Sequence, residues 1–190
     1  MKSYHPTTII YRPRILHFVL FPIVLIICYF GPLSAQTIQT YSTENGIPSI
    51  FPATTIKPAN SPNTLNLYQN NQGIPDVAPS QVIKIRPSGE KEIYNTQNGI
   101  PEITPYQIIK PTRNGGFDIY DTQNGIPSIS PTKTIKPGFS GRFDVFDNQH
   151  GIPSISPSQT LKPNQSGGYD VYQNQHGIPG LAPVEVIKKD

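Results

Sequence analysis

The chain has 190 residues, a formal net charge of +3 at pH 7 and a single cysteine, Cys28. Three of its 15 basic residues precede residue 36 and all 12 acidic residues follow it, so residues 36–190 are formally neutral. Because nucleic-acid binding depends on a basic surface that neutralises phosphates, this composition excludes a nucleic acid as partner. Residues 36–190 contain no cysteine, which excludes disulfide and thiolate chemistry in that part of the chain.

The first 35 residues have the pattern of a targeting segment. Basic residues at Lys2, Arg12 and Arg14 are followed by the apolar run 15–30 and then by small residues up to Ala35. This order is typical of a secretory signal peptide, and the run is shorter than the roughly 20 residues that span a bilayer. We predict a signal peptide over residues 1–35 and a secreted, extracellular or cell-envelope protein. The alternative is an uncleaved anchor, in which case only this segment contacts a membrane.

The remainder of the chain repeats one short pattern. A fixed period of 26 residues, 27 in the first step, indicates tandem structural repeats. We therefore predict six β repeats within residues 36–190, at about 38–57, 65–84, 91–110, 117–136, 143–162 and 169–188. The repeated tripeptide Gly-Ile-Pro begins at Gly46, Gly73, Gly99, Gly125, Gly151 and Gly177.

Each repeat contains two segments that favour strands. One surrounds an aromatic residue five positions before the glycine, and the other ends at a lysine eleven positions after it. β-Branched and aromatic residues are typical of strands, whereas Gly, Pro and Asn between them mark turns. The Asn, Gln or His before each glycine, including His150 and His176, fits a turn with positive φ. The prolines place the Gly-Ile-Pro segment in a connection or at a sheet edge.

Charge spacing predicts how successive repeats pair. An acidic residue stands eight positions after the lysine at four junctions, so an antiparallel hairpin would place the two side chains opposite each other. We predict an all-β fold in which the repeats form an elongated antiparallel hairpin or meander array, with a β-solenoid as the alternative. The expected register pairs are Lys84 with Glu92, Lys110 with Asp118, Lys136 with Asp144, and Lys162 with Asp170.

The aromatic column has two interpretations. Tyrosines in a row can stack on sugars or contact a protein partner, which makes the column a candidate interaction surface. Because each repeat contains few apolar residues, we favour the alternative that these rings pack against the isoleucines of the same sheet. The residues concerned are Tyr94, Tyr120, Phe146 and Tyr172.

The pattern favours a structural protein over an enzyme. Every distinctive residue recurs in several copies, whereas an active centre normally breaks such consistency at one place. We predict no catalytic residue, no cofactor and no metal site. The expected function is a secreted, non-enzymatic scaffold that can assemble into fibres, and the alternative is a glycan-binding or adhesive surface module.

The expected partners follow from these two functions. In an open array, the terminal strands offer unpaired backbone groups to another chain, and residues 36–42 carry no charge to prevent such pairing. The scaffold would therefore bind a second copy of itself through its strand edges. The adhesive module would instead bind a glycan or a protein on a cell surface.

Overall fold

The computed structural model describes residues 36–189, and the segment 1–35 that we interpret as a signal peptide lies outside the described residues. Within residues 36–189 all strand pairs are antiparallel and the only helical element is one short 3₁₀ turn, which confirms the predicted all-β class. The elements are β1 (Ile38–Glu44), β2 (Ile47–Pro48), β3 (Thr54–Pro58), β4 (Thr64–Asn71), β5 (Ile74–Pro75), β6 (Gln81–Ile85), β7 (Lys91–Gln97), β8 (Ile100–Pro101), β9 (Gln107–Pro111), β10 (Phe117–Gln123), β11 (Ile126–Pro127), β12 (Lys133–Pro137), η1 (Phe139–Gly141), β13 (Phe143–Gln149), β14 (Ile152–Pro153), β15 (Gln159–Pro163), β16 (Tyr169–Gln175), β17 (Ile178–Pro179) and β18 (Glu185–Lys189).

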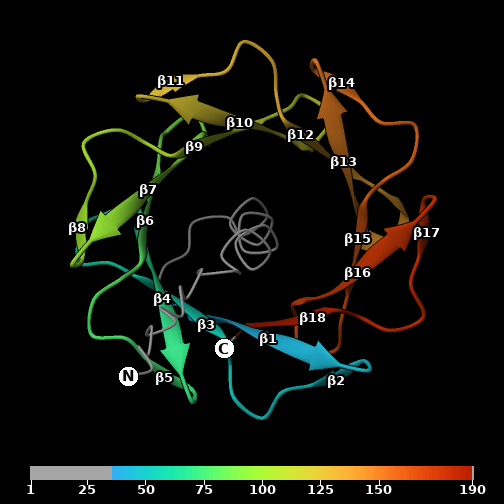
Figure 1. Ribbon diagram of the computed structural model, residues 1–190, viewed down its shortest axis with the longest axis horizontal. Helices are drawn as coiled ribbons and strands as arrows, with labels where there is room; N and C mark the ends of the chain where they lie inside the picture. Colours follow the sequence, from blue (N-terminus) through green and yellow to red (C-terminus); the bar gives the residue numbers. More distant parts are fainter. Residues whose placement is uncertain (1–35, 190) are drawn as a thin grey trace, which may run out of the picture.

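The sheet closes into a barrel (Figure 1). A long and a five-residue strand alternate, and each pairs with its neighbours in chain order from β1 and β3 through to β16 and β18. Five residue pairs then join β18 to β1, from Ile38 opposite Lys189 to Ser42 opposite Glu185. Within the described residues this gives a ring of twelve strands, and the six two-residue strands are additional to it.

The predicted elongated open array is therefore wrong, and so is the β-solenoid alternative. Adjacent antiparallel strands are rotated relative to one another in a constant sense, so a sheet with enough strands curls until its edges meet. Six repeats bring the last strand beside the first. Closure removes the two unpaired edges, so the predicted edge-to-edge assembly lacks the free strands that it needs.

One face of the strands forms a continuous apolar core. Alternate residues point to the same face of a strand, and this face collects buried apolar side chains from all twelve strands. Ile83 lies opposite Ile93, and Ile109 opposite Ile119, so the isoleucine columns of successive repeats meet directly. The aromatic rings that enter this core stand three positions before the predicted column. They are Phe117, Phe143 and Tyr169.

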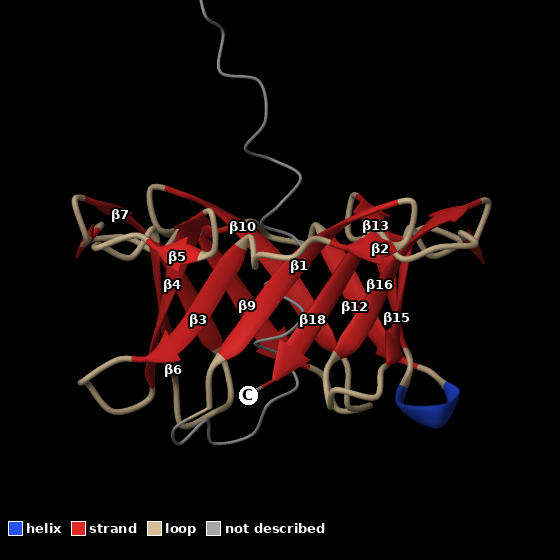
Figure 2. Ribbon diagram, turned by 90° about the horizontal axis from the view of Figure 1, so that it is seen from below, coloured by secondary structure: helices blue, strands red, loops and turns tan. Residues whose placement is uncertain are grey.

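A projecting brim surrounds one end of the barrel (Figure 2). In each repeat the long strand extends beyond the barrel wall, turns, and pairs with the two-residue strand that contains Ile-Pro. The residue before the glycine and the glycine itself both have positive φ, such as 51° at Asn45 and 81° at Gly46, as a two-residue hairpin turn requires. We define the brim as residues 44–53, 71–80, 97–106, 123–132, 149–158 and 175–184.

Each brim hairpin packs against the brim hairpin of the neighbouring repeat around the ring. A methyl group added at Gly151 would lie 2.5 Å from Ser130 of the preceding repeat, and one at Gly46 would lie 2.7 Å from Ala182 of the last repeat. A hydroxyl also joins neighbouring repeats, because Thr122 donates to the carbonyl oxygen of Pro105. The glycine is therefore required both for the turn and for the contact between repeats.

Substitution of a brim glycine should destabilise the barrel more than substitution of a glycine with the same backbone but open surroundings. Gly151→Ala combines positive φ with a steric clash, whereas Gly115→Ala at φ 75° meets no atom within 4 Å. We expect Gly115→Ala to cost about 1 kcal/mol and Gly151→Ala a further 1–3 kcal/mol of unfolding free energy. Denaturant unfolding of both variants measures the difference, and equal losses would contradict the interlocked brim.

Candidate functional site

The outer face of the barrel wall carries the predicted register pairs. The structure places Lys84 opposite Glu92 in the β6–β7 pair, and it places the other three pairs in the equivalent positions. These are Lys110 opposite Asp118, Lys136 opposite Asp144, and Lys162 opposite Asp170.

The lysines of these pairs stack on aromatic rings. The Nζ atom of Lys84 lies 4.5 Å from the centre of the Tyr94 ring, which is the diagonal neighbour two residues beyond Glu92. A cation over a ring face is attracted by the ring quadrupole, and this contact is worth about 0.5–1 kcal/mol at an exposed site. The contact recurs for Lys110 with Tyr120 at 4.9 Å, Lys136 with Phe146 at 4.7 Å, Lys162 with Tyr172 at 4.4 Å, and Lys188 with Tyr41 at 4.4 Å across the closing pair.

The acidic residues of the same pairs accept hydrogen bonds from other donors. Asp118 accepts from the Thr134 hydroxyl at 2.9 Å, on the strand on its other side. Asp144 accepts in the same way from Thr160, and its second oxygen forms an ion pair with Arg142 at 2.9 Å. These two carboxylates therefore link their strands to the next strand, whereas Asp170 accepts from Asn164 in the preceding loop. The register follows the charge pattern, but the ion pairs found in the described residues have other partners.

The carboxylate of Glu92 accepts hydrogen bonds from two side chains near it in the sequence. Its carboxylate accepts from Arg86 at 2.7 Å and from the Tyr94 hydroxyl at 2.9 Å. Burial is the largest influence and raises the pKa of Glu92, but the hydrogen bonds from Arg86 and Tyr94 and the charges of Arg86 and Lys84 together outweigh it, so the pKa lies below its ordinary value. Burial followed by the bond to Glu92 raises the pKa of Tyr94. This cluster fixes the ring of Tyr94 in place.

The predicted aromatic column does not pack against the isoleucine core. Tyr120, Phe146 and Tyr172 are half-buried on the outer wall, and Tyr94 is buried there beneath its neighbours. They lie opposite the core because the side chain five positions before the glycine points away from the face of Ile119 and Val145. A lysine of the same sheet already covers one face of each ring, so that face is not free to stack on a sugar.

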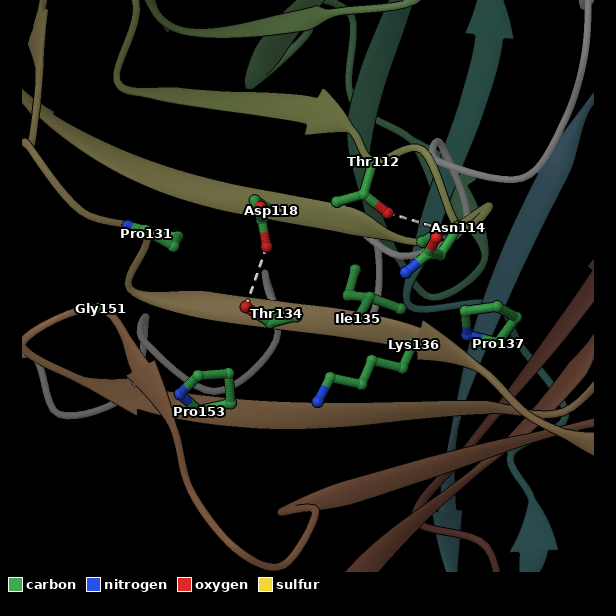
Figure 3. Close-up of a pocket in the computed structure, with 11 residues that line it drawn as sticks. Thr112, Asn114, Asp118, Pro131, Thr134, Ile135, Lys136, Pro137, Gly151 and Pro153 are labelled. Carbon is green, nitrogen blue, oxygen red and sulfur yellow. Dashed lines mark hydrogen bonds between the residues drawn. The ribbon is translucent and has the colours of Figure 1, made fainter.

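A shallow groove of about 480 Å³ runs along the outer wall between β10 and β12. Figure 3 shows a hydrogen bond joining Asp118 and Thr134, and the Lys136 side chain extending from β12 toward Pro153. Asn114 belongs to the loop at one end of the groove, and Pro153 belongs to the brim hairpin at the other. The groove offers hydrogen-bonding groups to a small polar ligand, although Asp118 and Thr134 already satisfy each other.

The brim carries exposed aliphatic side chains that the sequence did not distinguish from core residues. The side chains one and four positions after each brim glycine are between 71% and 107% exposed. The repeated columns were visible in the sequence, but an isoleucine column by itself does not reveal whether it faces the core or the solvent. The twelve residues are Ile47, Ile50, Ile74, Val77, Ile100, Ile103, Ile126, Ile129, Ile152, Ile155, Ile178 and Leu181.

Glu185 is a buried acid that the sequence reasoning missed. It stands on the inner face of β18 beside the closing pair with β1, and its Oε1 atom is buried without a hydrogen-bond partner. Burial raises its pKa to about 8, and a hydrogen bond from Thr40 opposes this only in part. Glu185 stands eight positions after the brim glycine, where three other repeats have Gln81, Gln107 and Gln159. An acid in place of a glutamine is the feature of the sequence that could have identified this position.

Three further features bear on the function of this chain. Within residues 36–189, no group of three or more His, Cys, Asp and Glu side chains could hold a metal ion. His150 and His176 have φ values of 52° and 50° and lie at brim turns, as the turn interpretation predicts. In the same part of the chain, no helix is long and apolar enough to cross a membrane.

Replacing Glu185 should remove a pH dependence of stability. Between the ordinary pKa of 4.5 and the folded value of about 8, the folded protein keeps a proton that the unfolded chain has lost. Stability contributed by this group therefore falls as pH rises through that window. We expect Glu185→Gln to raise the melting temperature at pH 8.5 and to leave it unchanged at pH 4. The exposed Glu102→Gln serves as control, and an equal gain at both pH values would contradict the assignment.

A double-mutant cycle can separate the two possible partners of the wall lysines. Because Lys136 stacks on Phe146, we expect Lys136→Met and Phe146→Leu to show a coupling of about 0.5–1 kcal/mol in unfolding free energy. Lys136→Met and Asp144→Asn should couple by less than this, since Asp144 binds Arg142 and Thr160. The reverse order of couplings would show that the ion pair dominates.

Comparisons with known proteins assign no family to this chain. No protein-family model matches the sequence, and no curated protein matches it. Among solved structures, the chain is similar to BamB from Moraxella catarrhalis, with 11% identity and a TM-score of 0.28. The alignment covers 67% of this chain and spans 57% of the length of that one. A similarity at this level transfers neither a fold nor a function.

Proposed function

We propose that this chain is an exported, non-enzymatic scaffold protein whose contact surface is the brim. The observation that carries the proposal is the ring of twelve exposed aliphatic side chains at one end of a closed barrel. Soluble monomers rarely expose large apolar surfaces, and those that do use them as interaction sites. The same side chains recur in all six repeats, so the surface is a regular part of the architecture.

The barrel supports a scaffold in a second way. Closure pairs each of the twelve wall strands on both sides, and contacts of the brim glycines and of wall lysines such as Lys188 link neighbouring repeats. Such a ring holds its brim residues in a fixed arrangement without a disulfide or a metal. The pattern of residues 1–35 supports export, because it has the charged, apolar and small segments of a signal peptide in order.

Cell fractionation of a bacterial host that produces the full chain tests this function. We expect the protein outside the cytoplasm with an N-terminus near Gln36, and we expect a chain without residues 2–35 to stay inside. A variant with Ile103→Ser, Ile129→Ser and Ile155→Ser should be exported equally but lose the cross-links to a partner, whether envelope, matrix or a second copy, that the parent protein forms in the exported fraction. Cytoplasmic retention of the full chain, or unchanged cross-linking of the variant, would contradict the proposal.

The outer wall supports a second candidate, a glycan-binding or adhesive function. The groove beside Asn114, Asp118 and Lys136 presents the amide, carboxylate and ammonium groups that commonly bind sugar hydroxyls. A glycan array can test it with the double variant Asn114→Ala and Lys136→Ala, which alters the groove, and with the triple variant Tyr94→Ala, Tyr120→Ala and Tyr172→Ala, which alters the aromatic column. Binding that the folded double variant loses would support the groove as the site, whereas loss in the triple variant alone would place the site at the aromatic column. A parent protein that binds no glycan would contradict the adhesive function.

A further inference from the structure

The brim has a composition unlike the rest of the surface. Its six segments contain no lysine or arginine, although residues 36–190 contain 12 of them. Its acids are confined to the first three repeats, one in each: Glu44, Asp76 and Glu102. Depletion of charge around exposed aliphatic groups is typical of the buried centre of a protein–protein interface. A surface that binds anionic lipid would instead carry basic residues.

The regular spacing of the brim restricts the partner. Each of the six brim segments contains an equivalent pair of exposed aliphatic side chains. The brim hairpins stand at regular positions around the ring (Figure 1). A protein that covers all of them must present apolar groups with the same spacing around a ring. The brim of a second copy presents apolar groups with this spacing, because it is the same surface. A contact between two identical surfaces is the commonest arrangement in homo-oligomers.

The position of the acids selects one orientation of the two copies. When two rings meet face to face about a two-fold axis, the repeat order of one runs opposite to that of the other. In one register, repeats 1, 2 and 3 face repeats 6, 5 and 4, so every acid-bearing segment faces an acid-free one. In this register the segment of Glu44 faces that of His176, and the segment of Asp76 faces that of His150. Each of the other five registers places acid-bearing segments opposite each other.

We propose that two copies of this chain associate brim to brim about a two-fold axis, with repeats 1, 2 and 3 of one copy over repeats 6, 5 and 4 of the other. This inference rests on the proposed function only in treating the brim as the contact surface. It replaces assembly through strand edges, which closure of the barrel removes. It also limits the assembly to two copies, because both brims are then covered.

Sedimentation velocity of the purified exported protein over a wide concentration range tests the inference. We expect the mass of two chains, and a single-chain mass for the variant with Ile103→Ser, Ile129→Ser, Ile155→Ser and Leu181→Ser. The variant should raise the dissociation constant at least 100-fold while keeping its circular dichroism spectrum and melting transition. The matched control replaces the exposed wall lysines Lys57, Lys84, Lys136 and Lys162 with glutamine and should remain a dimer.

Charge substitutions test the register. His176→Asp places an acid opposite Glu44 of the other copy and should weaken the dimer about tenfold. Adding Glu44→Lys to that variant should restore it, since a lysine then faces the new acid. An unchanged dissociation constant in both variants would overturn the register.

Three other outcomes would overturn the inference. The parent protein could keep a single-chain mass, form an open series of oligomers, or float as single chains with phosphatidylcholine vesicles in a way that the serine variant does not. The last outcome would assign the brim to a lipid surface. Correct export with a single-chain mass refutes the dimer and leaves the scaffold function, whereas a dimer that stays in the cytoplasm refutes export alone.

Discussion

The pairing of β18 with β1 is the interaction on which the rest of the structure depends. It turns a row of similar hairpins into a ring, so each of the twelve wall strands has a neighbour on both sides and each repeat lies between two others. The side-chain contacts follow the same rule across this junction. Lys188 stacks on Tyr41 as the other lysines stack on their rings, and Gly46 packs against Ala182 as the other brim glycines pack on their neighbours.

The ring also explains why the two rims differ. Because the long strands all run in one direction, every Gly-Ile-Pro turn lies at one end of the barrel and every junction loop between repeats lies at the other (Figure 2). The turns contribute aliphatic side chains, whereas the junctions contribute residues such as Arg86, Arg113 and Arg142. The aliphatic side chains of one turn are thereby repeated six times around one end. The barrel consequently has one apolar rim, and three arginines lie among the loops of the opposite rim.

The sequence predicted local structure well because local structure depends on neighbouring residues. Positive φ at the residue before each brim glycine was predictable from its Asn, Gln and His side chains, and strand character from the β-branched residues. Closure was not predictable, because it depends on twist accumulated over all twelve strands. The contacts of the charged residues were missed for a similar reason. Lys84 lies opposite Glu92 but stacks on Tyr94, and the spacing of residues in the sequence does not define the side-chain geometry that decides between these two contacts.

The repeat also determines how such a protein can change in length. Every unit contributes one ascending and one descending strand, so gain or loss of a whole unit leaves the terminal strands antiparallel and able to pair. Loss of a single strand would leave them parallel, with mismatched hydrogen bonds at the junction. Recombination within this sequence is therefore tolerated in steps of one complete repeat, and each step would yield a ring of different diameter. The width of such a barrel therefore depends on the number of complete repeats.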